Sequence, residues 1–261
     1  MSISYLEKGQ GTPLVLLHGI GSAARSFAAQ LDGLSSHWRV LAWDAPGYSQ
    51  SDPLPMAHPT APDYADALEG FLAERGIADF HLLGHSLGCL MAASFAARRP
   101  GRVLSLTLSA IAGGHATLPA ADRQKLLDQR LRDVETLGPR GMAEKRAPRL
   151  LGPAAPKEAL AKVIDTMGSV RPAGYAQAAR MLSTGDVAAD IAKLPAGLPG
   201  QVIVGDGDVI TPVARNRDIA AKWSGAAVHV IPGAGHALYL EQPAAFNSII
   251  AEFLTRTGKS S

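Results

Sequence analysis

The chain has 261 residues, of which 47% are hydrophobic and 18% charged, and its formal net charge at pH 7 is +2. This length is enough for one large domain with a sizeable core, and the near-neutral charge gives no basis for binding nucleic acid or an acidic membrane surface. The single cysteine, Cys89, excludes internal disulfides and multi-cysteine metal sites.

The N-terminal residues 1–8 lack the basic and apolar regions of a signal peptide. No apolar run elsewhere approaches the roughly 20 residues that are needed to span a bilayer. A single cysteine also suits a reducing compartment. We therefore expect a soluble, cytoplasmic protein that is not associated with a membrane.

Short apolar runs alternate with helix-like stretches along most of the chain. The expected strands are residues 14–17, 39–43, 80–83, 103–108, 201–204 and 227–231, and the expected helices include residues 63–75, 89–97 and 243–254. Apolar strands separated by helices are typical of parallel strands joined by helical crossovers. The pattern therefore predicts an α/β protein with a mostly parallel sheet flanked by helices.

The alternation changes over residues 115–186, which are helical in pattern and strongly charged. We expect this segment to be a helical cap inserted into a core formed by residues 1–114 and 187–261, since its length is marginal for an independent domain. It contains twelve Lys and Arg residues and eight Asp and Glu residues, so its net charge of +4 exceeds the +2 of the whole chain. Most of these charges are expected on a solvated helical surface, and the alternative is attraction of an anionic substrate.

The pentapeptide Gly84-His85-Ser86-Leu87-Gly88 joins an expected strand to an expected helix. A serine at such a tight turn takes a strained backbone conformation that exposes its hydroxyl group, and glycines on either side avoid clashes with the adjacent strand and helix. The start of the helix also directs free N–H groups at the reacting substrate. The pattern predicts Ser86 as a nucleophile and the N–H of Leu87 as an oxyanion donor. His85 adjoins the nucleophile but is expected to face away from it.

The loop after the first expected strand, Gly19-Ile20-Gly21-Ser22-Ala23-Ala24, allows two interpretations. It matches the Gly-x-Gly-x-x-Ala fingerprint of dinucleotide-binding folds, with Asp44 at the end of the next strand as the ribose-binding acid. However, His18 stands where that fingerprint normally has an apolar or small residue, and the interpretation gives Ser86 no role. We favour an oxyanion loop in which the backbone N–H of Ile20 is the second donor.

A serine hydroxyl needs a base to remove its proton, and His236 has the best context among the eight histidines. It follows the last expected strand, in a loop of small residues that can bring the imidazole over the sheet edge. A carboxylate must then stabilise the imidazolium, and the loop after the preceding strand offers Asp208 and Asp206. Asp208 is preferred because it stands just before the expected start of a helix, and Asp206 is the alternative.

Together these segments resemble the α/β-hydrolase superfamily over nearly the full length of the chain. The matching segments are His18–Gly21, Asp44–Asp52, the turn at Ser86, Gly205–Asp208, Gly235–His236 and Leu240–Asn247. The resemblance implies that Asp208 is the acid of a Ser-His-Asp triad, and the chain order Ser86, Asp208, His236 is that of the superfamily. Within the superfamily the chain looks most like bacterial esterases, 3-oxoadipate enol-lactonases and carbon–carbon hydrolases of aromatic degradation. Residues 172–176 are similar to an enol-lactonase segment, whereas Cys89 stands where many relatives have a second glycine.

The residues and the resemblance together predict a serine hydrolase without cofactor or metal, acting on a small carboxylic ester or lactone through an acyl-enzyme. The serine nucleophile argues against haloalkane dehalogenases and epoxide hydrolases, which use an aspartate. Two alternatives stay open. One is hydrolysis of a carbon–carbon bond in aromatic ring-cleavage products, and the other is non-catalytic ligand binding with the cap as a lid. The substrate itself does not follow from membership of a fold.

Overall fold

The computed structural model describes residues 1–258, and within these residues seven strands form one sheet in the order β1-β3-β2-β4-β5-β6-β7. Strands β2 to β7 run parallel, and β1 pairs antiparallel with β3 at one edge. The strands are β1 (Tyr5–Lys8), β2 (Pro13–Leu17), β3 (Arg39–Trp43), β4 (Phe80–His85), β5 (Val103–Ser109), β6 (Gly200–Gly205) and β7 (Ala227–Ile231). The prediction of a mostly parallel sheet is confirmed.

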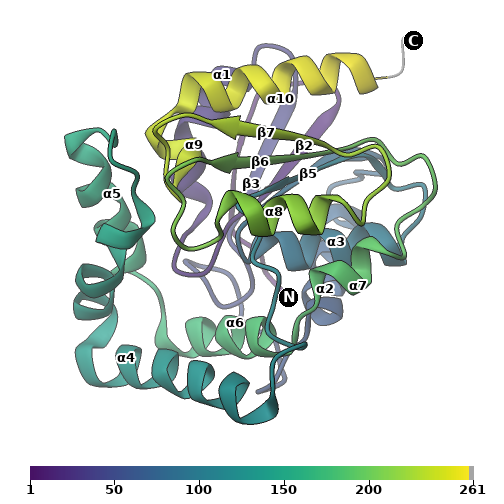
Figure 1. Cartoon of the computed structure of the whole chain (residues 1–261). Coiled ribbons are helices and arrows are strands. Elements are labelled where there is room, and N and C mark those ends of the chain that lie inside the picture. The colour runs from purple at the N-terminus through teal and green to yellow at the C-terminus, as the bar shows by residue number, and fades with distance from the viewer. Residues whose placement is uncertain (259–261) are drawn as a thin grey trace.

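Helices cover both faces of this sheet (Figure 1). On one face lie α1 (Ala28–Leu34) and α10 (Pro243–Thr257); on the other lie α2 (Ala61–Ala73), α3 (Gly88–Arg98), α7 (Val187–Ile191) and α8 (Val213–Ala220). Because successive side chains of a strand point to opposite faces, Leu16 of β2 packs with Phe246 of α10, while Val15 packs on the side of α3. In the part of the chain that the structure describes, no helix has both the length and the apolar character needed to cross a membrane.

The predicted elements are present with small shifts at their ends. Helix α2 begins at Ala61 instead of residue 63, because Thr60 and Asp63 form a capping box in which the Asp63 carboxylate accepts from the backbone N–H of Thr60 at 2.7 Å. Strand β1 was not predicted. It is an edge strand with three exposed residues out of four, so it carries little of the apolar pattern by which buried strands are detected.

Residues 115–186 form the helices α4 (Ala120–Arg146), α5 (Lys157–Met167) and α6 (Pro172–Thr184), with a short 3₁₀ turn, η2 (Ala147–Leu150), between α4 and α5. Helix α4 is kinked at Gly138, whose φ of 65° lies outside the helical region. Figure 1 shows α4 and α5 set apart from the sheet, at the end towards which β6 and β7 point. The two ends of the segment meet, because Ala116 donates its N–H to the Gly185 carbonyl at 3.1 Å.

Candidate active site

Ser86 occupies the turn between β4 and α3. Its φ of 52° places it in the left-handed region, which is strained for a residue with a side chain. The backbone N–H of Ser86 donates to the Ser109 carbonyl at 2.8 Å, which fixes the turn against β5. A side chain at Gly84 would clash with the backbone of Gly88, and one at Gly88 would clash with the Leu17 carbonyl. The predicted strand-turn-helix geometry around the serine is confirmed.

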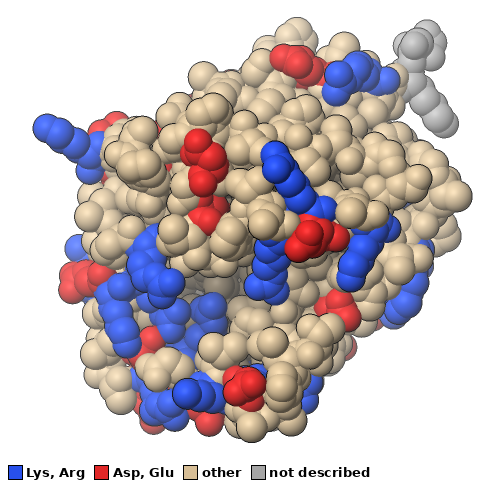
Figure 2. Space-filling view, in the orientation of Figure 1, with Lys and Arg blue, Asp and Glu red and all other residues tan. Residues whose placement is uncertain are grey.

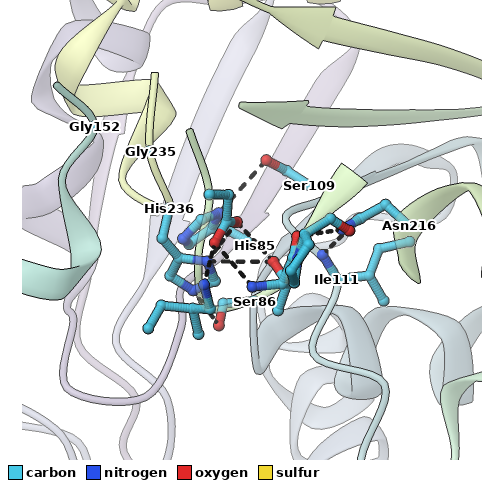
Figure 3. Close-up of polar contacts among 12 residues, drawn as sticks. His85, Ser86, Ser109, Ile111, Gly152, Asn216, Gly235 and His236 are labelled. Carbon is cyan, nitrogen blue, oxygen red and sulfur yellow. Dashed lines mark hydrogen bonds and ion pairs between the residues drawn. The ribbon is translucent and has the colours of Figure 1, made fainter. Parts of the chain in front are cut away.

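The structure brings the three residues of the expected triad together, each from a loop that follows a different strand. Ser86 Oγ lies 2.9 Å from His236 Nε2, and His236 Nδ1 lies 2.8 Å from Asp208 Oδ2. Figure 3 shows the imidazole of His236 directed at Ser86. All three side chains are buried, with at most 7% of any of them exposed. The arrangement places the imidazole of His236 where it can accept the proton of Ser86, and it places the carboxylate of Asp208 on the other side of that imidazole.

Asp208 is held as a carboxylate by its own loop. Its Oδ1 accepts from the backbone N–H groups of Ile210 and Thr211, each at 2.8 Å, and its Oδ2 accepts from the Thr211 hydroxyl at 2.7 Å. Burial raises the pKa of Asp208, but the hydrogen bond and charge of His236, with the bonds from Thr211, bring this pKa below its ordinary value. Asp206, by contrast, is exposed and accepts from the Gly233 N–H at 2.7 Å. The geometry therefore favours Asp208 over Asp206 as the partner of His236.

Ile20 and Leu87, the expected oxyanion donors, both line the cavity that contains Ser86. Within residues 1–258 neither of their backbone N–H groups donates to another protein group, so both are free for a ligand. The loop that carries Ile20 is fixed by His18, whose Nε2 accepts from the Ala45 N–H at 3.0 Å and whose Nδ1–H donates to the Gly19 carbonyl at 2.8 Å. These bonds require a neutral imidazole, and burial correspondingly lowers the pKa of His18.

Asp44, the acid of the dinucleotide interpretation, is committed to the protein itself. Its Oδ1 accepts from the Ala24 N–H and its Oδ2 from the Ser4 hydroxyl, both at 2.9 Å. The side chain is buried with 7% exposed, and it ties the loop after β2 to Ser4, the residue before β1. A ribose-binding acid would have to face outward, whereas Asp44 is buried and bonded within the protein. Asp44 therefore has a structural role. Among residues 1–258, no group of three or more His, Cys, Asp or Glu side chains is placed to hold a metal ion.

The expectation that His85 faces away from the nucleophile is wrong, because its side chain lies beside His236 in the cavity that contains Ser86. The centroid of the His85 ring lies 5.2 Å from the ring of His236 and 4.7 Å from the ring of Tyr239. Burial, followed by the charge of His236, lowers the pKa of His85 well below its ordinary value, so the ring is neutral. The sequence carried no signal for this contact because it depends on how the loop after β7 folds over the turn.

Two further buried side chains hold the loops of the site in place. Asn216 of α8 accepts from the backbone N–H of Ile111 at 2.9 Å and donates to the Thr211 carbonyl at 2.7 Å, which joins the end of β5 to the Asp208 loop. Glu241 of α9 (Leu238–Glu241) accepts from the N–H groups of Gly235 and Gly152. Figure 3 shows Gly152 and Gly235 side by side above His236.

A cavity of about 970 Å³ opens above Ser86. The loops at the ends of the strands form its floor, and its walls come from α4, α5 and α8. Apolar side chains such as Leu126, Val163, Met167 and Leu182 line it together with a group of basic side chains. This volume is in the usual range for small-molecule sites.

A serine, a histidine and an aspartate bonded in series at the ends of parallel strands define the site of an α/β hydrolase. Residues 14–249 match the family model described as Alpha/beta hydrolase family, and the chain belongs to this family. The chain is therefore a hydrolase whose substrate is a small molecule.

The chain is similar to hydrolases of known structure or assignment. It is 26% identical over 259 residues to the (E)-2-((N-methylformamido)methylene)succinate hydrolase of Acinetobacter baylyi, covering 97% of this chain and 94% of that protein. It is 26% identical to a malate-bound thermophilic esterase from Thermogutta terrifontis, with a TM-score of 0.89 over 98% of this chain and 93% of that chain. The enol-lactonase from Burkholderia xenovorans LB400, 24% identical, shares the fold with a TM-score of 0.87 over 97% of this chain and 96% of that chain. The predicted resemblance to bacterial esterases is confirmed.

Proposed function

We propose that this chain is a cofactor-free serine hydrolase that cleaves a small carboxylic ester or lactone through an acyl-enzyme. The observation that carries the proposal is the pair of hydrogen bonds from Ser86 Oγ to His236 Nε2 at 2.9 Å and from His236 Nδ1 to Asp208 Oδ2 at 2.8 Å. The similarity to an esterase at 26% identity supports an ester as the bond cleaved.

Each residue has one task in the proposed reaction. His236 removes the proton of Ser86 as its Oγ attacks the carbonyl carbon, and Asp208 stabilises the imidazolium that forms. The backbone N–H groups of Ile20 and Leu87 bind the oxyanion of the tetrahedral intermediate, and each such donor typically contributes about 2.7–4 kcal/mol to transition-state stabilisation. His236 then protonates the leaving oxygen, and afterwards it activates the water that releases the acyl group from Ser86.

We further propose that residues 115–186 act as a cap over a core formed by residues 1–114 and 187–261. Both ends of the segment meet at the sheet, since Val187 donates its N–H to the Gly113 carbonyl at 3.1 Å. Side chains of α4 and α5 form one wall of the cavity above Ser86. A cap in this position excludes water from the reacting bond and decides which substrates enter.

The test is the activity of Ser86→Ala on a panel of small neutral esters, anionic esters and lactones. We expect kcat to fall by about 10⁴- to 10⁶-fold, with an unchanged melting temperature. Ser94→Ala is the matched control, because Ser94 is buried in α3, its hydroxyl has no hydrogen-bond partner among residues 1–258, and it does not line the cavity. Activity of Ser86→Ala close to that of the wild-type chain would refute the proposal. Rapid cleavage of a ring-cleavage diketone, with slow cleavage of every ester and lactone, would assign a carbon–carbon bond instead.

A further inference from the structure

The cavity above Ser86 is lined by many more cations than anions. Its basic side chains are Arg25, Arg130, Lys145, Arg146, Arg149, Lys162 and Arg215, and its acidic side chains are Asp133 and Asp165. Seven positive and two negative charges give a net of +5 in the cavity, compared with +2 for the whole chain. Figure 2 shows Lys and Arg side chains gathered around the hollow between α4, α5 and α8. The positive charge of the protein is therefore concentrated around the cavity above Ser86.

The two acidic side chains are already paired. Asp133 accepts from Lys145 at 2.8 Å and from Arg146 at 2.5 Å. Asp165 accepts from Arg140, which lies outside the cavity, at 2.7 Å. The Asp133 pairs join two parts of α4, and the Asp165 pair joins α5 to α4. Neither acid neutralises the remaining cations of the cavity.

Arg130 and Arg215 are cations of the cavity that have no carboxylate partner within residues 1–258. Arg130 comes from α4, and its Nη1 is 3.4 Å from the Tyr175 hydroxyl. Arg215 comes from α8, and its Nη2 is 3.4 Å from the Gly114 carbonyl. Both contacts are at the long limit for a hydrogen bond, so most of the guanidinium N–H groups are free to bind a ligand.

Arg130, Arg215 and His115 line the same cavity, and Arg215 Nη2 lies 3.4 Å from the carbonyl of Gly114, the residue before His115. Burial, followed by the charges of Arg130 and Arg215, lowers the pKa of His115 to about 4. Gly113 makes room for this approach, because a Cβ at that position would lie 2.9 Å from Arg215 Nη2. Arg215 therefore contacts the loop that carries His115, and Arg130 lines the same cavity from α4.

The loop that carries His115 also contacts the backbone of the nucleophile. Ala112, three residues before His115, donates its N–H to the carbonyl of Ser86 at 3.3 Å. Arg130 and Arg215 place two positive charges, which have no carboxylate partner in the described part of the chain, on the lining of one cavity, and a carboxylate bound in that cavity would be attracted by both. Guanidinium groups also match the two oxygens of a carboxylate better than any other side chain does.

We infer that Arg130 and Arg215, with the ring of His115, form a carboxylate subsite, and that the substrate is an ester or lactone carrying a free carboxylate. The inference rests on the proposed function for the bond that is cleaved, but the subsite itself is defined by these three side chains alone.

The first test compares monomethyl glutarate with methyl pentanoate, two methyl esters of equal chain length that differ in the carboxylate. We expect kcat/KM to be at least about 10-fold higher for monomethyl glutarate. Arg130→Gln and Arg215→Gln should each lower the ratio of kcat/KM for monomethyl glutarate to kcat/KM for methyl pentanoate by about 10- to 100-fold. Arg132→Gln and Arg217→Gln are matched controls, because they remove the same charge from the same helices outside the cavity. Equal effects of all four variants would overturn the subsite while leaving the proposed function intact.

The second test measures binding without catalysis. Glutarate and inorganic phosphate are titrated into Ser86→Ala by calorimetry, with the NMR signal of His115 followed in the same protein. We expect glutarate to bind, the pKa of His115 to rise as the anion neutralises its neighbours, and Arg215→Gln to abolish both effects. If no ester is cleaved by the wild-type chain, this result still decides the subsite. Tighter binding of phosphate than of glutarate, or no binding of glutarate, would overturn the carboxylate assignment.

Discussion

The carboxylate of Glu241 accepts a hydrogen bond from the backbone N–H of Gly235, the residue directly before His236, at 3.1 Å. The same carboxylate accepts from the N–H of Gly152, in the segment that follows η2, at 2.7 Å. Only 3% of Glu241 is exposed. Burial raises the pKa of Glu241, and the bonds from Gly152 and Gly235 offset part of that rise. One buried carboxylate therefore joins the histidine loop to the helical segment above it.

Replacing Glu241 should displace His236 without unfolding the protein. We expect Glu241→Ala to lower kcat by about 10²-fold with little change in KM, because a small misplacement of the base is costly while the cavity keeps its shape. Glu241→Gln keeps one carbonyl acceptor and should recover part of the loss. The measurement is the steady-state kcat and KM of both variants. Glu252→Ala is the control, because Glu252 is at an exposed position on α10. Equal losses in Glu241→Gln and Glu241→Ala would contradict a positioning role.

The two aspartates of the loop after β6 should respond very differently to substitution. In Asp208→Asn, one side-chain oxygen is still required by the N–H groups of Ile210 and Thr211, so the amide nitrogen faces His236 and enforces the wrong tautomer. We expect kcat to fall by about 10⁴-fold. Asp206→Asn retains an acceptor for the Gly233 N–H and should have nearly wild-type kcat. A larger loss in Asp206→Asn would show that Asp206 is the acid.

A methyl group at Gly19 should disturb the nucleophile directly. A Cβ there would lie 2.9 Å from Ser86 Cβ and 3.4 Å from Ser86 Oγ. The distance to Ser86 Cβ is shorter than packing allows. We expect Gly19→Ala to lower kcat/KM by about 10²-fold. Gly70→Ala is the control, because no atom lies within 4 Å of the added methyl group on α2. That control should keep full activity and raise the free energy of unfolding by about 0.5–1 kcal/mol.

Acid should destabilise the fold through histidines that are buried and neutral. Burial lowers the pKa of His81, in β4 beneath the active site, to about 4. Between pH 6.5 and pH 4 the unfolded chain therefore binds a proton that the folded chain does not, so the free energy of unfolding falls as the pH is lowered through this window. The contribution of His81 to the free energy of unfolding over this window is on the order of 3 kcal/mol.

Urea unfolding of the wild-type chain and of His81→Gln at several pH values measures this contribution. The variant should lose less stability than the wild-type chain between pH 6.5 and pH 4, whereas His37→Gln, at an exposed position, should follow the wild-type chain. Parallel curves for His81→Gln and the wild-type chain would contradict the assignment.

The sheet and the three central residues could be predicted because each rests on local chemistry. The turn at Ser86 needs glycines within two residues, and the loops of Asp208 and His236 each follow an apolar run that reads as a buried strand. Contacts between segments that are distant along the chain leave no such pattern in the sequence. The contact of His85 with Tyr239 depends on the fold of the loop after β7.

The basic lining of the cavity was predicted only in part. The positive charge of residues 115–186 was visible in the sequence, and Arg130 belongs to that segment. Arg215 belongs to a short helix of the core, and nothing in its neighbourhood marks it as part of the site. It lines the same cavity as Arg130 because the folded chain brings α4 and α8 to that cavity.

The central claim, that Ser86 is an activated nucleophile, is tested most directly by mass spectrometry of the intact chain after reaction with a fluorophosphonate probe. A serine without a base reacts poorly with such a reagent. We predict one adduct per chain, located on the peptide that contains Ser86 and absent in Ser86→Ala and His236→Ala. Absence of any adduct on the wild-type chain, or an adduct on a different serine, would contradict the account.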